Sequence, residues 1–291
     1  MGSDARIELQ PRDVAVLVGL FESRLMTLAH VAALFFDDKA EYAKKRVQRL
    51  KAAGYLVERP RRAYDPSILH LTPHAIAFLR REGLLDRFPR LPAASYAKRT
   101  QVSDLTLVHE RQVMDVKTAI VRAVRGDPSL AIEEFSTWPR LNEFAAQGSR
   151  GDRIVVRPDG FIRLGMTTPH ERVEHTFYIE VDRGSEVLDT LVNRAAAYLD
   201  HYRSGGLAVR FGASASHYKE YPFRVLIVVP TDARRNNLAT RLLKNDPPIR
   251  QLVWMTTFED VIRDPLGHIW LAPADFDEAN VGNRSKRLLL A

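Results

Sequence analysis

The segment from Val155 to Gly184 constrains the fold most, because carboxylates interrupt an otherwise apolar, strand-like pattern there. Successive side chains of a β-strand point to opposite faces, so Glu180 and Asp182 share one face, opposite the apolar residues around them. If the chain reverses between Pro169 and His170, Asp159 on the preceding strand stands opposite Glu180. The sequence therefore predicts a β-hairpin with one polar face and one apolar face that packs in the core.

The predicted pairing places two like charges side by side. Directly opposite Cβ atoms of paired strands lie about 4.5–5.5 Å apart, so Asp159 and Glu180 would repel each other. A divalent cation removes that repulsion, and Mg²⁺ binds one or two carboxylates together with water and phosphate oxygens. The alternatives are an ordinary turn acid at Asp159, and a solvated face or pairs with Arg163 and Arg183 for the other two acids. The residues alone leave these interpretations open.

Helix and strand patterns alternate after residue 103. The expected order is a helix from Ser103, a strand at 131–138, a polar loop at 142–153, the hairpin, a helix at 185–206, a strand at 224–230, a helix at 233–245 and a strand at 252–257. Such alternation is typical of layered α/β domains. We therefore expect an α/β (α+β) domain with a central mixed sheet.

The excess positive charge of the chain lies in its first third. The net charge is +7, and residues 1–100 hold 18 of the 43 Lys and Arg residues but only 11 of the 36 Asp and Glu residues. The remaining residues are therefore neutral as a group. A basic segment joined to a neutral one is typical of proteins that bind nucleic acid. A solvated basic surface without such a partner is the alternative.

The first third also predicts three helices, a two-stranded hairpin and a fourth helix. Thr27 is expected to cap the second helix, and Thr72 is expected to cap the fourth helix, which Pro73 begins. The third helix, 39–53, has an apolar stripe that includes Tyr42. Its exposed basic residues are Lys39, Lys44, Lys45, Arg46, Arg49 and Lys51.

This order of elements predicts a winged helix-turn-helix. In such a domain the third helix enters the major groove of double-stranded DNA, so Lys44, Lys45, Arg46 and Arg49 are candidate DNA contacts. Arginines in the turn of the hairpin, such as Arg61 and Arg62, would contact phosphates. A small protein-interaction domain is the alternative.

Two prolines, Pro89 and Pro92, mark a boundary in the chain. We expect a winged-helix domain at 1–92, a linker at 93–102 and an α/β domain at 103–291. The sequence has no cysteine, which excludes disulfides and thiolate chemistry and fits a reducing cytoplasm. No apolar run approaches the ~18 residues of a membrane span, so no membrane association is expected. A homodimer is a further possibility.

The acidic motifs resemble those of a known group. Asp159 after Pro158 on one strand, and Glu180 and Asp182 around one valine on the next, resemble the core of the PD-(D/E)xK nucleases. Together with the N-terminal winged helix, the segments RPDG and FYIEVDRG are similar to the replication-relaxation family, related to MobC-type plasmid relaxases. The resemblance spans most of the chain. It implies that Asp159 and Glu180 bind Mg²⁺ or Mn²⁺, which activates water for phosphodiester cleavage.

The sequence departs from that pattern at Asp182, where the wider superfamily usually has lysine. The cationic role could move to Arg183 or to Arg194 on the following helix, since an arginine can clamp a phosphate with two hydrogen bonds. Asp182 could instead be a third metal ligand. The resemblance also extends to a His-Glu pair on the first helix of the domain. It implies that Glu110 is an extra metal ligand and that His109 is a base or phosphate contact.

Two functions follow from this interpretation. The first is a metal-dependent nuclease or relaxase-like protein that nicks or processes DNA in plasmid or mobile-element replication or transfer. The second is a DNA-binding regulator or replication accessory factor whose nuclease-like site is catalytically inactive, as the missing lysine would suggest. A protein-interaction scaffold is a third alternative. Whether the chain is an enzyme is left open by the sequence.

Overall fold

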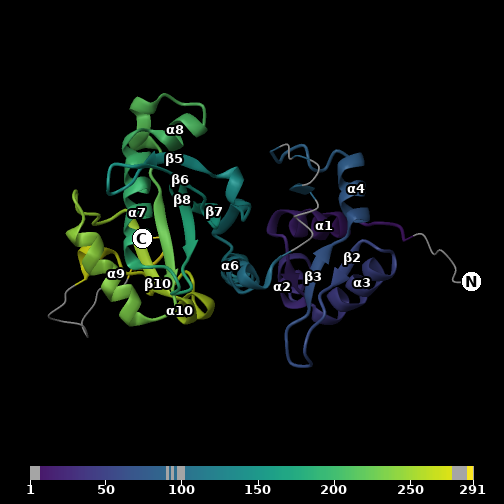
Figure 1. The fold of residues 1–291 in the computed structure, drawn as a ribbon. Helices are drawn as coiled ribbons and strands as arrows, with labels where there is room; N and C mark the ends of the chain where they lie inside the picture. The colour runs from purple at the N-terminus through teal and green to yellow at the C-terminus, as the bar shows by residue number, and fades with distance from the viewer. Residues whose placement is uncertain (1–6, 90–91, 93–94, 97–101, 277–286, 291) are drawn as a thin grey trace, which may run out of the picture. The chain divides into compact units, whose positions relative to one another are not determined.

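A computed structural model describes residues 7–89, 92, 95–96, 102–276 and 287–290 (Figure 1). The chain divides into two compact units, Met1–Thr118 and Ala119–Ala291. The division falls inside one long helix, α6 (Asp104–Arg125). Most of the expected linker at 93–102 lies outside the described residues.

The N-terminal unit contains the predicted helices and hairpin. In chain order these are α1 (Pro11–Ser23), β1 (Met26–Thr27), α2 (Leu28–Phe35), α3 (Ala40–Ala52), β2 (Leu56–Glu58), β3 (Ile68–Leu71) and α4 (Pro73–Arg81). β3 pairs antiparallel with both β1 and β2, and the short β1 adds a third strand that the sequence did not predict. Figure 1 shows the loop between β2 and β3 extending away from this small sheet.

Side-chain caps fix where two of these helices begin. The hydroxyl of Thr27 accepts a hydrogen bond from the backbone N–H of His30 at 3.1 Å. The hydroxyl of Thr72 accepts one from the N–H of Ala75 at 3.2 Å. Each bond satisfies a backbone donor that has no partner within its helix. Both predicted caps are confirmed.

A buried ion pair joins α1 to α3. Asp13 is fully buried, and its carboxylate receives the guanidinium of Arg46, whose Nε donates to Oδ1 at 2.6 Å. The backbone N–H of Gln10 donates to the same carboxylate at 2.7 Å. Arg46 was predicted to face DNA together with its basic neighbours on α3. The structure instead places its charge against α1, where it compensates a carboxylate that has no access to water.

The C-terminal unit has the predicted α/β class, with a central mixed sheet of five strands in the order β10-β9-β8-β7-β4. Its described elements after α6 are β4 (Leu130–Ser136), β5 (Phe144–Gln147), β6 (Arg153–Val156), β7 (Gly160–Thr167), β8 (Arg172–Val181), α7 (Leu188–Arg203), α8 (Gly206–Arg210), β9 (Arg224–Val229), α9 (Asp232–Lys244), β10 (Val253–Thr257) and α10 (Phe258–Arg263). Single-turn 3₁₀ helices lie at Pro139–Leu141 and Pro273–Asp275, and a longer one at Ala215–Glu220. β8, β9 and β10 run parallel, whereas β4 and β7 are antiparallel to their neighbours.

The register of the β7–β8 hairpin is the predicted one, with Phe161 opposite Tyr178 and Ile162 opposite Phe177. The prediction that only one face packs in the core was wrong. Tyr178 and Glu180 on the other face are as buried as Phe177. They are covered because α7 packs across this face, where the ring of Tyr198 lies 5.2 Å from that of Tyr178.

The segment at 142–153, predicted to be a polar loop, contains strand structure. β5 and β6 form a separate two-stranded sheet that packs on α7. Ala146 and Val156 point into the same core as Tyr198. The small apolar side chains of this hairpin are buried by α7, a contact that its polar composition did not indicate.

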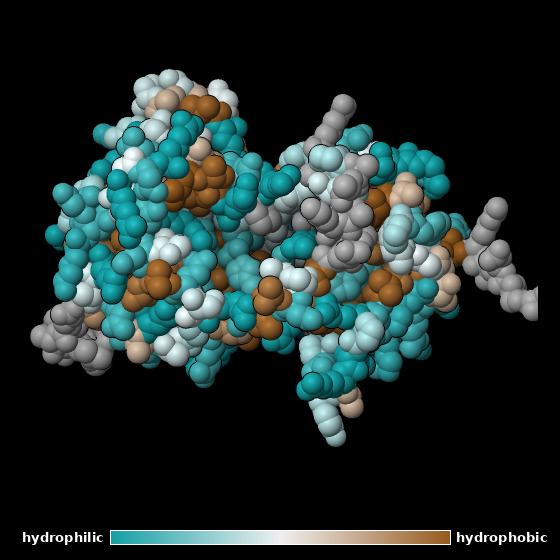
Figure 2. Space-filling view, in the orientation of Figure 1, coloured by the Kyte–Doolittle hydropathy of each residue, from teal (hydrophilic) through white to brown (hydrophobic). Residues whose placement is uncertain are grey.

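The surface visible in Figure 2 is mainly hydrophilic in both units, with hydrophobic side chains in small separate patches. Within the residues that the structure describes, no helix combines the length and the apolar character needed to cross a membrane.

We predict that Arg46→Ala destabilises the N-terminal unit by about 3–5 kcal/mol, because it leaves the buried carboxylate of Asp13 without its counter-ion. Urea denaturation followed by circular dichroism measures the loss. Lys45→Ala is the control, because Lys45 is exposed on the same helix and its removal should change stability by no more than about 0.5 kcal/mol. Equal effects of the two substitutions would contradict the structural role of Arg46.

Candidate functional site

Two of the predicted acids lie together where β7 begins and β8 ends. Asp159 immediately precedes β7, and its Oδ2 accepts a hydrogen bond from the backbone N–H of Val181 at 2.8 Å. The confirmed hairpin register places Asp159 beside Glu180. The charge of Asp159 is close enough to contribute to a raised pKa at Glu180. The structure therefore brings together the pair that the sequence predicted.

Both carboxylate oxygens of Glu180 accept hydrogen bonds. Arg194 Nη1 donates to Oε2 at 2.8 Å, and the hydroxyl of Tyr198 donates to Oε1 at 2.6 Å. Arg194 and Tyr198 are four residues apart on α7, so both face the sheet from successive turns. Glu180 itself is only 2% exposed. Its side chain is thus buried, and both of its oxygens are bound by donors from α7.

Burial raises the pKa of the Glu180 carboxyl to about 7, while the charge of Arg194 opposes the shift and that of Asp159 adds to it. Removal from water disfavours the ionised form, which is the physical origin of the main effect. Burial likewise raises the pKa of Tyr198 well above its ordinary value, and the charge of Glu180 adds to that shift. Tyr198 is fully buried and its hydroxyl donates to Glu180, so in this conformation the hydroxyl is not accessible to a phosphodiester.

Asp182 is held by an arginine that the sequence did not single out. Arg234 on α9 forms a two-pronged ion pair with this carboxylate, with Nε close to Oδ2 and Nη2 3.1 Å from Oδ1. The backbone N–H of Gly184 also donates to Oδ1 at 2.9 Å, in a turn where Gly184 has a φ of 82°. Such a positive φ favours glycine. Asp182 therefore holds this turn and α9 together.

Among the other predicted residues, Arg194 contacts Glu180, as expected for a cation beside the acids, and it also lies 3.4 Å from Glu186. Arg183 is exposed. Glu110 lies in the N-terminal unit, where its carboxylate pairs with Arg24 at 2.7 Å, and the half-buried His109 precedes it on α6.

The arrangement does not fit a divalent metal site as it stands. Among the described residues, no group of three or more His, Asp and Glu side chains is placed to hold a metal ion. Both oxygens of Glu180 accept hydrogen bonds, and both oxygens of Asp182 have donors. Mg²⁺ or Mn²⁺ at Asp159 and Glu180 would have to displace Arg194.

The sequence analysis did not predict two residues that contact the acids, Tyr198 and Arg234. Each has a weak sequence signal for its position. Tyr198 lies one helical turn after Arg194, which is the spacing of residues that share a helix face. Arg234 is in the first turn of the helix that follows β9. β8 and β9 are parallel neighbours, with Val181 opposite Val228, so the segments that follow them meet at one sheet edge.

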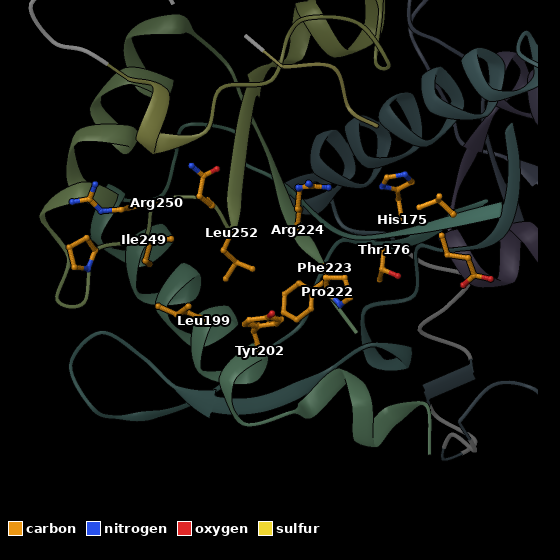
Figure 3. Close-up of a pocket in the computed structure, with 14 residues that line it drawn as sticks. His175, Thr176, Leu199, Tyr202, Pro222, Phe223, Arg224, Ile249, Arg250 and Leu252 are labelled. Atoms are coloured by element: carbon orange, nitrogen blue, oxygen red, sulfur yellow. The ribbon is translucent and has the colours of Figure 1, made fainter. Parts of the chain in front are cut away.

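A pocket of about 530 Å³ lies at the other end of β8 (Figure 3). Apolar side chains from α7 and the segments that precede β9 and β10, among them Leu199, Tyr202, Phe223 and Leu252, form much of its wall. Its one carboxylate, Glu174, pairs with Arg163 at 2.5 Å. The pocket contains none of the predicted acids and is separate from their site.

The basic face of α3 is the second candidate site. Ala43, Val47 and Leu50 are buried, which leaves Lys44, Lys45 and Arg49 exposed on the outer side of the helix. Within the described part of the chain, the side chains of these three cations have no hydrogen-bond or ion-pair partner. Their positive charge is therefore available to a ligand.

Tyr42 was expected in the apolar stripe of α3, but it is 70% exposed. The buried stripe is narrower than predicted because α3 contacts the rest of the unit through Ala43, Val47 and Leu50. Tyr42 therefore lies on the same surface as Lys45 and Arg49, which follow it at three and seven residues.

The loop between β2 and β3 carries the other predicted contacts. Arg61 Nε donates to Glu58 at 3.0 Å, and its Nη1 donates to the backbone oxygen of Asp65 at 2.8 Å. Arg61 thus stabilises the loop. Arg62 is exposed, and Tyr64 at the tip is fully exposed.

A model of the replication-relaxation family matches residues 17–211, about two thirds of the chain. The chain belongs to the replication-relaxation family. The match includes the basic face of α3, the hairpin acids and the α7 residues that contact Glu180, whereas Arg234 lies beyond it. No curated protein and no solved structure matches the chain. Membership in the replication-relaxation family points to a role in plasmid or mobile-element replication or transfer.

We predict that Glu180→Gln removes a pH dependence of stability. Between the ordinary carboxyl pKa of 4.5 and about 7, the folded wild type binds a proton that the unfolded chain has lost. The wild type therefore loses stability as pH rises through this range, and the variant does not. Relative to the variant, the wild type should lose on the order of 3 kcal/mol between pH 4 and pH 8.

Urea denaturation of both proteins at the two pH values measures this difference. Glu186→Gln is the control, because Glu186 is exposed and also near Arg194. An equal change with pH in wild type and Glu180→Gln would show that Arg194 keeps the carboxylate ionised throughout.

Proposed function

We propose that this replication-relaxation protein binds double-stranded DNA through its N-terminal unit during plasmid or mobile-element replication or transfer. The observation that carries the proposal is the outer face of α3, where Lys44, Lys45 and Arg49 are exposed without acidic partners in the described chain. Phosphate neutralisation by such cations supplies most of the affinity of a protein for DNA.

The arrangement of elements supports a winged helix-turn-helix. A tight turn joins α2 to α3, and both of its aspartates, Asp37 and Asp38, have positive φ values of 49° and 61°. α2 and α3 then pack against each other, and an antiparallel β2–β3 hairpin follows. In such domains the second helix of the pair enters the major groove, which here is α3.

The exposed aromatic on α3 fits the same surface. The hydroxyl of Tyr42 can hydrogen-bond to a phosphate oxygen or a base edge, as tyrosine and amide side chains do in protein–DNA interfaces. Gln48 is exposed on the same helix and can pair with an adenine. The face therefore combines cations that position the helix with neutral groups that can read bases.

The C-terminal unit is proposed to act as an accessory domain without catalysis. The Asp159–Glu180 pair supports a PD-(D/E)xK-type origin, and with it a relation to MobC-type relaxases. In the present arrangement, however, Glu180 forms an ion pair with Arg194, and Asp182 forms one with Arg234. These ion pairs hold α7 and α9 at the sheet edge, where an active nuclease would bind its metal and water.

Metal-dependent strand cleavage is the second candidate function. The observation that favours it is the adjacency of Asp159 and Glu180, since the charge of Asp159 adds to the raised pKa of Glu180. This function requires Arg194 to leave Glu180, so that both acids face a cation. The two candidates therefore differ in whether the ion pair opens when DNA and metal are bound.

We expect Lys45→Ala combined with Arg49→Ala to weaken binding to a duplex of about 30 base pairs. If both cations contact phosphates, the slope of log affinity against log salt should fall by about 2. Fluorescence anisotropy across a salt series measures both quantities. The control is Arg241→Ala combined with Lys244→Ala, which removes the same charge from α9. Unchanged binding of the α3 variant would contradict the proposal, as would the absence of binding by the wild type.

Incubation of supercoiled plasmid with the protein and Mg²⁺ or Mn²⁺ separates the two candidates. The proposed function predicts no nicking by the wild type above a protein-free control, because Glu180 and Asp182 remain paired with Arg194 and Arg234. Nicking that disappears in Asp159→Ala and Glu180→Ala, but persists in Asp152→Ala, would establish the second candidate. Asp152 is an exposed acid on the β5–β6 turn and serves as the matched control.

A further inference from the structure

A groove of about 600 Å³ lies in the N-terminal unit between the β2–β3 loop and the first turns of α6. Its cationic groups come from both sides, with Arg62 on the loop and Arg111 on α6. Ile68, Leu107 and Val108 contribute an apolar lining. The groove thus combines cationic groups from two elements with an apolar lining, and the carboxylates of Asp65 and Asp104 also line it.

One face of α6 forms the wall of this groove. Leu107 and Val108 lie three and four residues after Asp104, and Arg111 lies four and three residues after them, so the four residues form a single stripe along the helix. Val108 is 38% exposed although it is apolar, which is consistent with an open groove and not with a core position.

Ion pairs on other sides of α6 fix it to the rest of the unit. Glu110 pairs with Arg24 at 2.7 Å, and Lys117 pairs with Glu22 at 3.2 Å. Asp115 lies 2.7 Å from His30 Nε2. Arg111 is therefore held at a defined place opposite the loop by the two turns of helix that follow it.

The arginines that line the groove differ in whether their guanidinium groups already have hydrogen-bond or ion-pair partners. Arg59 donates to the backbone oxygen of Val102 at 2.8 Å and pairs with Asp104. Arg61 is bound to Glu58 and to the backbone of Asp65. By contrast, the guanidinium groups of Arg62 and Arg111 make no hydrogen bond or ion pair within the described residues. They are the two cations of the groove that are available to a ligand.

We propose that this groove holds the sugar–phosphate backbone of one strand of the DNA duplex bound by α3. Phosphates contact Arg62 and Arg111, and the deoxyribose between them packs on Leu107 and Val108. The inference rests on the proposed duplex binding and adds α6 to the interface. We favour a DNA strand over an acidic protein segment because the β2–β3 loop, the predicted wing that follows α3 and β2 in the chain, supplies Arg62 to the groove.

The first test is the affinity and salt dependence of Arg62→Gln and Arg111→Gln with the same duplex of about 30 base pairs. Each variant should bind roughly 3- to 10-fold more weakly and lower the salt slope by about 1, because each loses one phosphate contact. Arg81→Gln is the control, since Arg81 is an exposed arginine of the same unit outside the groove. Circular dichroism confirms that each variant is folded.

The second test uses the absence of cysteine in the wild-type chain. Val108→Cys introduces a single thiol into the groove, and Arg81→Cys introduces one elsewhere on the unit. A duplex whose backbone carries a tether that ends in an activated mixed disulfide should form a disulfide cross-link with the first variant, by exchange that releases the small thiol, and not with the second. This proximity measurement does not depend on whether Arg111 also has a structural role.

The outcomes separate this inference from the proposed function. Weaker binding by the Lys45→Ala, Arg49→Ala variant, with unchanged binding by both groove variants and no cross-link at Val108→Cys, would overturn the groove proposal alone. Absence of any DNA binding by the wild type would overturn both. Loss of affinity in the groove variants together with a Val108→Cys cross-link supports the strand path along α6.

Discussion

The contact of Glu180 with Arg194 and Tyr198 is the constraint on which the C-terminal unit depends. A carboxylate buried between a sheet and a helix loses its hydration, and only donors from the covering helix can replace it. Both donors come from α7, one turn apart, so the same contact sets how α7 crosses the sheet. The ring of Tyr198 also packs against that of Tyr178, with the ring centroids 5.2 Å apart. Glu180, which the sequence places in a candidate reactive centre, is buried in this arrangement.

Local patterns were sufficient to predict much of the fold. The caps at Thr27 and Thr72 and the register of the β7–β8 hairpin depend on neighbouring residues or on one reversal, and all three are confirmed. The burial of both hairpin faces was not predictable in the same way, because it depends on α7, which packs there from elsewhere in the chain. Arg234 was missed for the same reason, since it reaches Asp182 across 52 residues of sequence.

The basic helix shows a related limit of sequence patterns. Periodicity separated the buried stripe of α3 from its charged side, but it could not distinguish cations that are free from those that are already neutralised. Lys45 and Arg46 are neighbours of equal charge, yet only Arg46 has a buried carboxylate within reach, on α1. Tyr42 shows the opposite error, because a residue of apolar character proved to be exposed. Long-range packing decides both cases, so a charge count alone overstates the positive charge that is unpaired on the surface.

The position of the unit boundary within α6 has a consequence for how the protein can be divided. A chain cut before residue 103, where composition alone suggests a domain limit, would lose the ion pairs that Glu110, Asp115 and Lys117 make with the first two helices. It would also remove Val113 and Met114, which are both buried. A fragment that ends after Thr118 retains these contacts. The N-terminal half of α6 is therefore a structural part of the basic unit, and an isolated fragment of this unit should include it.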